Sequence, residues 1–202
     1  MPTAALRVGV IVLAAGRGSR FGDESPKTLA RLGERPLVAH AVASAKASGL
    51  RPLVVVVGCQ AADVAAAAGR DVEVIENPFW AEGMSTSLRA GLAAVLADRT
   101  VSAVTVALAD QPRIGAGAYR RLVAAHADGA ELAVATYGGK RGHPVLIGRS
   151  YWDEAMKMTG DQGARTLLAK PEVVEVPCDG TGETTDVDTP ADLAALEGGA
   201  GG

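Results

Sequence analysis

Short apolar runs and helix-forming segments alternate along the chain. The apolar runs lie at residues 8–14, 52–58, 72–77 and 103–110. The segments rich in helix formers lie at residues 36–49, 60–69 and 85–98. Nearly continuous apolar strands separated by helices are typical of a mostly parallel sheet with helices on both faces. The pattern therefore predicts an α/β fold of three layers.

Beyond residue 115 the same alternation continues with shorter elements. A helix is predicted at residues 118–129, and the turn YGGKRG joins a strand at 131–139 to a paired strand at 142–148. Further strands are predicted at residues 173–178 and 183–188.

The last predicted helix, at residues 189–197, carries its own start signal. Thr189 can cap it, Pro190 suits its first turn, and Asp192 stands where a capping box places its acidic residue. The sequence has no internal repeat and no interdomain linker. We therefore expect one domain over residues 1–197, followed by a disordered glycine-rich tail at 198–202.

Composition narrows the class of protein. Apolar residues make up 48% of the chain and aromatic residues 3%, so the core is built from small and branched side chains. The sequence has no apolar run long enough for a membrane span, and its net charge of −3 gives no basic surface for nucleic acid. Cys59 and Cys178 form no CxxC pair, which favours a reducing, cytoplasmic setting, and we expect Cys59 to be structural.

The strand at 8–14 runs into a loop of small and basic residues, GRGSRFGDESPK. Ligands of open parallel sheets bind beyond the carboxyl ends of the strands. Gly16 and Gly18 allow backbone amides to approach a phosphate closely, while Arg17, Arg20 and Lys27 supply positive charge. We predict that this loop binds the triphosphate of a nucleotide. The alternative is a solvated loop in which the arginines have only surface roles.

Two other nucleotide-binding motifs fit this loop poorly. A dinucleotide fingerprint needs G-x-G-x-x-G and an acidic residue after the second strand. Here the spacing GRGSRFG is one residue too long, and Cys59-Gln60 follows the second strand. A Walker loop places glycine before its lysine, whereas Lys27 follows Pro26. An NAD-dependent oxidoreductase is therefore the weakest alternative.

Two acidic clusters are candidate metal ligands. Asp110 directly follows the apolar run at 103–109, while Asp186 and Asp188 lie two residues apart in a predicted strand and would share a face. Mg²⁺ prefers oxygen ligands and usually takes one or two protein carboxylates beside phosphate oxygens. One carboxylate from each cluster would suffice. The alternatives are that Asp110 caps the next turn and Asp188 caps the last helix.

The stretch NPFWAEGMSTSL, residues 77–88, follows the third strand. Gly83 permits an unusual turn, and Ser85, Thr86 and Ser87 place hydroxyls and amides at a helix start, which suits an anion or a nucleotide. The alternative is N-capping by Ser85 or Ser87.

The three histidines differ in their surroundings. His40 and His126 lie in helical patterns, and we expect no catalytic role for them. His143 lies in the turn RGHPVL, where it is either a structural hydrogen-bond donor or a contact to substrate.

Taken in order, these motifs resemble those of the MobA-like nucleotidyltransferases, and within that family the molybdenum cofactor cytidylyltransferase (MocA-like) branch. The motifs are LAAGRGSRFG with its lysine, GMSTSL, ADQP, GHP, GDQGAR and DVDTPADL. The resemblance covers about residues 7–196. The first loop alone is shared with many sugar-nucleotide pyrophosphorylases, whereas the whole set is far more specific. It implies a Rossmann-like, three-layer α/β/α nucleotidyltransferase fold with a mostly parallel central sheet.

The resemblance also implies residue roles. Lys27 would steady the α-phosphate, and Asp110 with Asp188 would hold Mg²⁺. The nucleotide base and phosphates would be bound by Leu13, Ala14, Ala15, Gly16, Arg17 and Gly18. The nucleotide sugar would be bordered by Gly83, Met84 and Ser85. The pterin side would be lined by Gly142, His143, Asp161 and Arg165. Ala15 favours CTP, because guanylyl-transferring members tend to have glycine there.

The implied reaction is attack by a phosphate of molybdopterin, with bound molybdenum, on the α-phosphorus of CTP, with release of pyrophosphate. Catalysis would consist of positioning and charge neutralisation by Lys27, Arg17 and an Mg²⁺ ion at Asp110. A molybdoenzyme or its chaperone is an expected partner. The alternatives are a guanylyl- or sugar-phosphate nucleotidylyltransferase of the same fold, and a non-catalytic protein that binds and delivers the cofactor.

Overall fold

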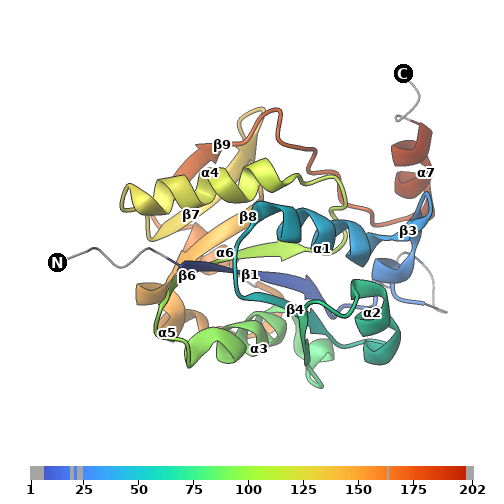
Figure 1. The fold of residues 1–202 in the computed structure, drawn as a ribbon, viewed down its shortest axis with the longest axis horizontal. Coiled ribbons are helices and arrows are strands. Elements are labelled where there is room, and N and C mark those ends of the chain that lie inside the picture. The colour runs from blue at the N-terminus through green and yellow to red at the C-terminus, as the bar shows by residue number, and fades with distance from the viewer. Residues whose placement is uncertain (1–6, 19–20, 22–24, 163, 199–202) are drawn as a thin grey trace.

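A seven-stranded sheet forms the centre of the computed structural model, which describes residues 7–18, 21, 25–162 and 164–198 (Figure 1). The strand order is β5-β4-β1-β6-β8-β7-β9. The strands are β1 (Arg7–Ala14), β4 (Leu53–Val57), β5 (Glu73–Glu76), β6 (Val101–Leu108), β7 (Leu132–Tyr137), β8 (Lys140–Gly148) and β9 (Val174–Pro177). Only β8 runs against the others within this sheet of the described chain. The prediction of a mostly parallel sheet is confirmed.

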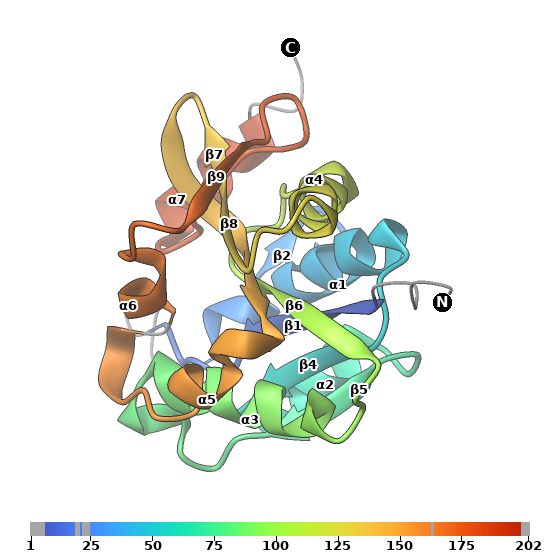
Figure 2. The same cartoon turned by 90° about the vertical axis from the view of Figure 1, so that its left-hand side faces the viewer.

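Helices cover both faces of the sheet (Figure 2). One face is covered by α1 (Leu37–Ser48), α2 (Ala61–Ala68) and α4 (Ala116–Ala127). The other is covered by α3 (Met84–Leu96), α5 (Trp152–Ala155) and α6 (Arg165–Leu168). Shorter elements are η1 (Lys27–Leu29), η2 (Trp80–Glu82), η3 (Arg149–Tyr151), η4 (Gly160–Gln162) and a small ribbon of β2 (Arg31–Leu32) and β3 (Arg35–Pro36). The three-layer α/β/α architecture is therefore present.

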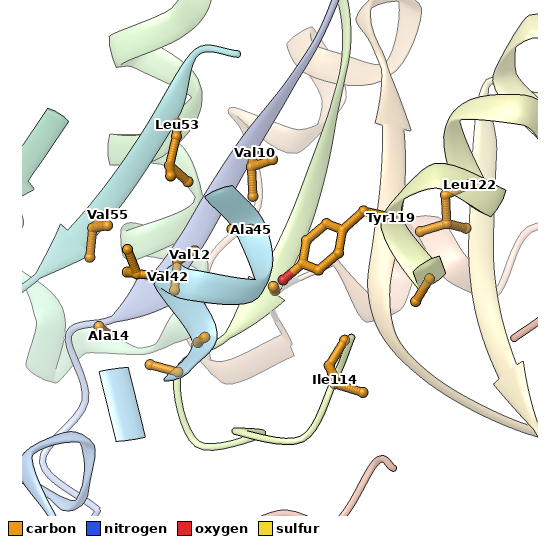
Figure 3. Packing of buried hydrophobic residues seen from close by; sticks show 14 of the residues in the cluster. Val10, Val12, Ala14, Val42, Ala45, Leu53, Val55, Ile114, Tyr119 and Leu122 are labelled. Carbon is orange, nitrogen blue, oxygen red and sulfur yellow. The ribbon is translucent and has the colours of Figure 1, made fainter. Parts of the chain in front are cut away.

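The alternation of side chains along β1 divides the interior into two cores. Val10 and Val12 pack under α1 and α4, whereas Ile11 packs under α3. Figure 3 shows the first core, in which Tyr119 of α4 points toward the sheet and α1. Small and branched residues dominate both cores, as the composition predicts.

The predicted strand at 183–188 is wrong. This segment has no regular secondary structure and bonds to the loop that follows β6 instead of joining a sheet. Glu183 N donates to Arg113 O at 3.2 Å, and Val187 N donates to Asp110 O at 3.0 Å. Because these bonds reach a loop, no ladder of strand pairs forms between them in the described chain.

The predicted start of the last helix, α7 (Pro190–Gly198), is confirmed. Thr189 N and Thr189 Oγ1 each donate to Asp192 Oδ2 at 2.8 Å, and Asp192 N donates back to Thr189 Oγ1 at 3.3 Å. This is the reciprocal bonding of a capping box. The expected tail was placed one residue too early, because Gly198 is the last residue of α7. Residues 199–202 lie outside the described residues, and the single-domain assignment stays a prediction.

The two cysteines, Cys59 and Cys178, are free and buried. No helix in the described part of the chain has the length and apolar character needed to cross a bilayer.

Candidate functional site

A cavity of about 380 Å³ lies at the carboxyl ends of β1 and β6, the edge where ligands of parallel sheets bind. The described residues that line it are Leu13, Ala14, Ala15, Gly16, Gly18, Lys27, Thr28, Trp80, Met84, Ser87, Leu108, Asp110 and Asp161. The loop after β1 thus shares one cavity with Lys27, Asp110 and the start of α3. Most of the residues predicted to bind the nucleotide therefore line the same cavity.

Lys27 reaches this cavity by passing over the loop that follows β1. Gly18 has φ +70°, and a Cβ on it would lie 2.6 Å from Lys27 Cγ. A glycine is therefore required for the lysine side chain to pass, a reason that the sequence pattern did not reveal. At Gly16 a Cβ would meet no described atom within 4 Å. Arg20 lies outside the described residues.

Lys27 joins the two acidic clusters. Its Nζ lies 2.5 Å from Asp110 Oδ2 and 2.7 Å from Asp188 Oδ1. The Lys27 and Asp110 side chains are each 15% exposed, so water screens this pair less than it would a surface pair. Asp110 therefore pairs with Lys27 from the end of β6.

The pKa of Lys27 reflects this arrangement. Burial alone would lower it, but the charges of Asp110 and Asp188 and the hydrogen bonds to them raise the pKa of Lys27 above its ordinary value. The ammonium is therefore held charged at the floor of the cavity.

Asp186 and Asp188 have separate environments. Asp188 turns to Lys27, whereas Asp186 Oδ1 accepts a hydrogen bond of 2.6 Å from Gln111 Nε2. Burial, with the nearby charges of Asp110 and Asp188, raises the pKa of Asp186, and the Gln111 hydrogen bond opposes that rise. The prediction that Asp186 and Asp188 share a strand face is wrong, because the segment forms no strand. Asp188 is the carboxylate that lies with Asp110.

Buried polar atoms without a partner gather around this site. Among the described residues these atoms are Thr28 Oγ1, Ser85 Oγ, Asp110 Oδ1 and Gln111 Oε1. Unsatisfied buried groups are costly and are characteristic of functional positions. The Asp110 oxygen fits a cation ligand, since carboxylate oxygens are what Mg²⁺ binds. No cluster of three or more His, Cys, Asp or Glu side chains placed to hold a metal occurs in the described ranges, so phosphate oxygens and water would have to complete the coordination.

The start of α3 is built against the segment around η4. Gly83, with φ +115°, is the N-cap, and a Cβ on it would collide with the backbone of Gly160 and Asp161. Met84 N donates to Asp161 Oδ1 at 3.3 Å. The carboxylate of Asp161 therefore lies at the positive end of α3.

The serines of α3 do not act as the N-cap. Ser85 is fully buried, and Ser87 Oγ accepts from Asn77 Nδ2 at 3.0 Å. Asn77 also binds Thr86 Oγ1, which donates to Gly83 O at 2.9 Å. Asn77 thus ties β5 to the first turn of α3.

A second cavity, of about 280 Å³, adjoins the first at Trp80. Arg17 lines it, and its guanidinium lies 6.0 Å from the Trp80 ring centroid, at the limit of a cation–π contact. The Arg17 side chain therefore lines the adjoining cavity and is not among the described residues that line the cavity of Lys27.

The predicted pterin-side residues are divided. Gly142 and His143 lie at the start of β8, beside the end of β6, and a Cβ on Gly142 would lie 2.8 Å from Thr184 Cγ2. Burial lowers the pKa of His143 to about 4, although the charge of Asp110 acts in the opposite direction. Arg165 is exposed on α6 and is not among the described residues that line either cavity.

His40 and His126 both make hydrogen-bond contacts through their ring nitrogens. His40 Nε2 lies 3.0 Å from Leu32 O, and the two ring nitrogens of His126 bond Ser102 Oγ and Ala130 O.

Sequence reasoning missed three participants. Trp80 lines both cavities, Thr28 lines the larger one, and Gln111 donates a hydrogen bond to Asp186. The only available signals were the position of Trp80 beside GMSTSL, of Thr28 beside Lys27, and of Gln111 beside Asp110.

Residues 10–176 match the MobA-like NTP transferase domain. The chain belongs to this family. A curated relative, the bifunctional protein GlmU of Kineococcus radiotolerans, is 36% identical over 127 residues, which are 62% of this chain and 26% of GlmU. The chain spans between a quarter and a third of the length of the GlmU relatives that it matches.

Solved structures agree with this assignment. Rv0371c of Mycobacterium tuberculosis H37Rv is 30% identical, with a TM-score of 0.83 over 97% of this chain and all of that chain. Its complex with manganese gives 28% identity and a TM-score of 0.77 over 95% of this chain and 98% of that one. Molybdopterin-guanine dinucleotide biosynthesis protein A of Archaeoglobus fulgidus shares the fold, at 18% identity and a TM-score of 0.65 over 95% and 98% of the two chains.

Proposed function

We propose that this NTP transferase transfers CMP from CTP to the terminal phosphate of molybdopterin carrying molybdenum, with release of pyrophosphate. The observation that carries the proposal is the placement of Lys27 between Asp110 and Asp188 in the cavity of the glycine loop. A nucleotidyl transfer needs such a cation at the α-phosphate and carboxylates for a divalent ion. A protein that only binds and delivers a cofactor has no need of this set.

The chain's own residues would hold the phosphates of the nucleotide and neutralise their negative charge. The loop from Gly16 to Gly18 offers its backbone to the phosphates, and Arg17 adds charge at its outer side. Lys27 already projects into the cavity and needs only to exchange its carboxylate partners for a phosphate oxygen. The acceptor phosphate is itself an anionic nucleophile, so no covalent enzyme intermediate is required.

Asp110 and Asp188 would hold the proposed Mg²⁺. The buried, unpartnered Oδ1 of Asp110 and the oxygen-only donor set support this, as does the manganese complex of Rv0371c. The ion held by these carboxylates would supply positive charge to neutralise the phosphates of the nucleotide.

The choice of CTP is supported by Ala15, which lines the cavity where guanylyl-transferring members of the family tend to have glycine. The molybdopterin acceptor is supported by the GHP motif, which lies beside Asp110 at the start of β8. A molybdoenzyme or its chaperone as recipient of the product belongs to the same proposal.

Calorimetric titration of each of the four nucleoside triphosphates in the presence of Mg²⁺ tests the substrate assignment. CTP should bind selectively, and Asp110→Asn should abolish the magnesium-dependent part of its binding. Selective binding of GTP would show that GTP, and not CTP, is the nucleotide substrate. Absence of binding by every nucleotide, with and without the acceptor, would refute the proposed function.

A further inference from the structure

The segment that carries Asp188 is held at three consecutive residues, two of them bonded to the loop after β6 and the third to Lys27 of η1. Asp186 accepts from Gln111, Val187 N donates to Asp110 O at 3.0 Å, and Asp188 binds Lys27. Because residues 183–188 pair with no strand of the described residues, these bonds set their register in place of a strand ladder.

Gln111 is the residue of the loop after β6 whose side chain bonds to the segment that carries Asp188. It is 5% exposed, and its Nε2 donates the short bond of 2.6 Å to Asp186. Val187 is fully buried with Leu37 and Leu196, which anchors the middle of the segment. On the far side, Asp192 Oδ2 accepts from Asp188 N at 3.1 Å. Gln111 is thus the contact that holds the segment immediately before Val187.

We propose that Gln111 is a positioning residue, whose hydrogen bond to Asp186 sets the register of Val187 and thereby places the Asp188 carboxylate beside Asp110. This inference rests on the proposed function, because it assigns Asp110 and Asp188 to the divalent cation. Asp186 acts here as the acceptor for Gln111 and not as a ligand of the cation.

A donor–acceptor exchange tests the proposal. Gln111→Leu removes the donor, and Gln111→Glu places a carboxylate against Asp186. The double variant Gln111→Glu with Asp186→Asn reverses the bond, since the new amide donates to the new carboxylate while the total charge is unchanged. Glu183→Gln is the matched control, because Glu183 lies on the same segment but pairs with Arg113 at 3.1 Å.

The measurement is Mn²⁺ affinity by electron paramagnetic resonance, with a non-hydrolysable CTP analogue present, alongside the melting temperature. Each Gln111 single variant should weaken Mn²⁺ binding about tenfold or more, the usual scale for losing a hydrogen bond to a charged group. The double variant should recover to within about threefold of the wild type, and the control should bind Mn²⁺ normally.

Three results would overturn the proposal. A lowered melting temperature with unchanged Mn²⁺ affinity would show a merely structural role. Tighter Mn²⁺ binding by Gln111→Glu would show that Gln111 faces the cation directly, and failure of the exchange to restore affinity would break the link to Asp186. If Gln111→Leu does not fold, the comparison of Gln111→Glu with the double variant Gln111→Glu and Asp186→Asn still tests the proposal. Absence of Mn²⁺ binding by the wild-type protein would refute the proposed function and, with it, this inference.

Discussion

Lys27 Nζ lies 2.5 Å from Asp110 Oδ2, and Asp188 holds the same ammonium from the opposite cluster. The Lys27 ammonium therefore neutralises the two carboxylates that are proposed to hold the metal. Lysine and a divalent ion compete for the same negative charge, and phosphate oxygens offer the lysine another partner.

Replacing Lys27 with Met should therefore have two opposite effects. Mn²⁺ affinity without nucleotide should rise about tenfold or more, because the competing positive charge is removed. Turnover should fall by about a hundredfold or more, the scale for loss of one preorganised charge donor. Paramagnetic titration and a pyrophosphate-release assay measure the two effects. A folded variant with near-normal turnover would exclude Lys27 from the proposed role.

The two carboxylates of the late acidic cluster should differ in importance. Asp188→Asn should lower magnesium-dependent turnover by about tenfold or more, because it removes a carboxylate beside Asp110. Asp186→Asn should have a much smaller effect, since an Asn oxygen still accepts from Gln111. Turnover measured across a magnesium titration distinguishes them. A larger loss in Asp186→Asn than in Asp188→Asn would reverse the assignment of the second ligand.

Two glycines of the first loop provide a matched pair. Gly18→Ala should destabilise the protein by about 1–2 kcal/mol and displace Lys27, because φ is +70° and the new Cβ meets the lysine side chain. Gly16→Ala should leave the melting temperature nearly unchanged, since open space surrounds that position, but should weaken nucleotide binding. Thermal unfolding and nucleotide calorimetry test both variants. Normal nucleotide binding by Gly16→Ala would show that no phosphate approaches Gly16 closely.

His143 should make the fold sensitive to acid. Burial lowers its folded-state pKa to about 4 from the ordinary value of 6.5, so the unfolded chain takes up a proton first as pH falls. Stability should be unaffected above pH 6.5 and should decline between pH 6.5 and about 4, by up to about 3 kcal/mol at 1.4 kcal/mol per pKa unit. Denaturant unfolding at several pH values should show that the free energy of unfolding falls less with acid in His143→Gln than in the wild-type protein. Equal declines in both proteins would assign the acid sensitivity to other groups.

The local pattern of apolar and polar residues was sufficient to predict the sheet and to bring several of the residues around the cavity together. Asp110 and the loop after β1 could be placed together because the carboxyl ends of parallel strands meet at one edge of a sheet. The alternation of valines along β1 and the capping box of α7 are likewise short-range signals. These elements need no information about distant parts of the chain.

The remaining features depend on long-range contacts. Residues 183–188 are rich in strand-forming residues, but their partner is the loop after β6, so no strand forms. The approach of Gly83 to Gly160, and the bond from Gln111 to Asp186, join segments that are far apart in the sequence. No pattern within either segment specifies the other.

Following the α-phosphorus of CTP tests whether the protein transfers a cytidylyl group. Purified protein is incubated with Mg²⁺, molybdopterin carrying molybdenum, and CTP labelled at the α-phosphorus, with Asp110→Asn in parallel. We predict that the label moves to the pterin product in step with pyrophosphate release, and that both are lost in the variant. Label that remains in CTP, under conditions where GTP or a sugar phosphate supports transfer, would contradict this substrate assignment.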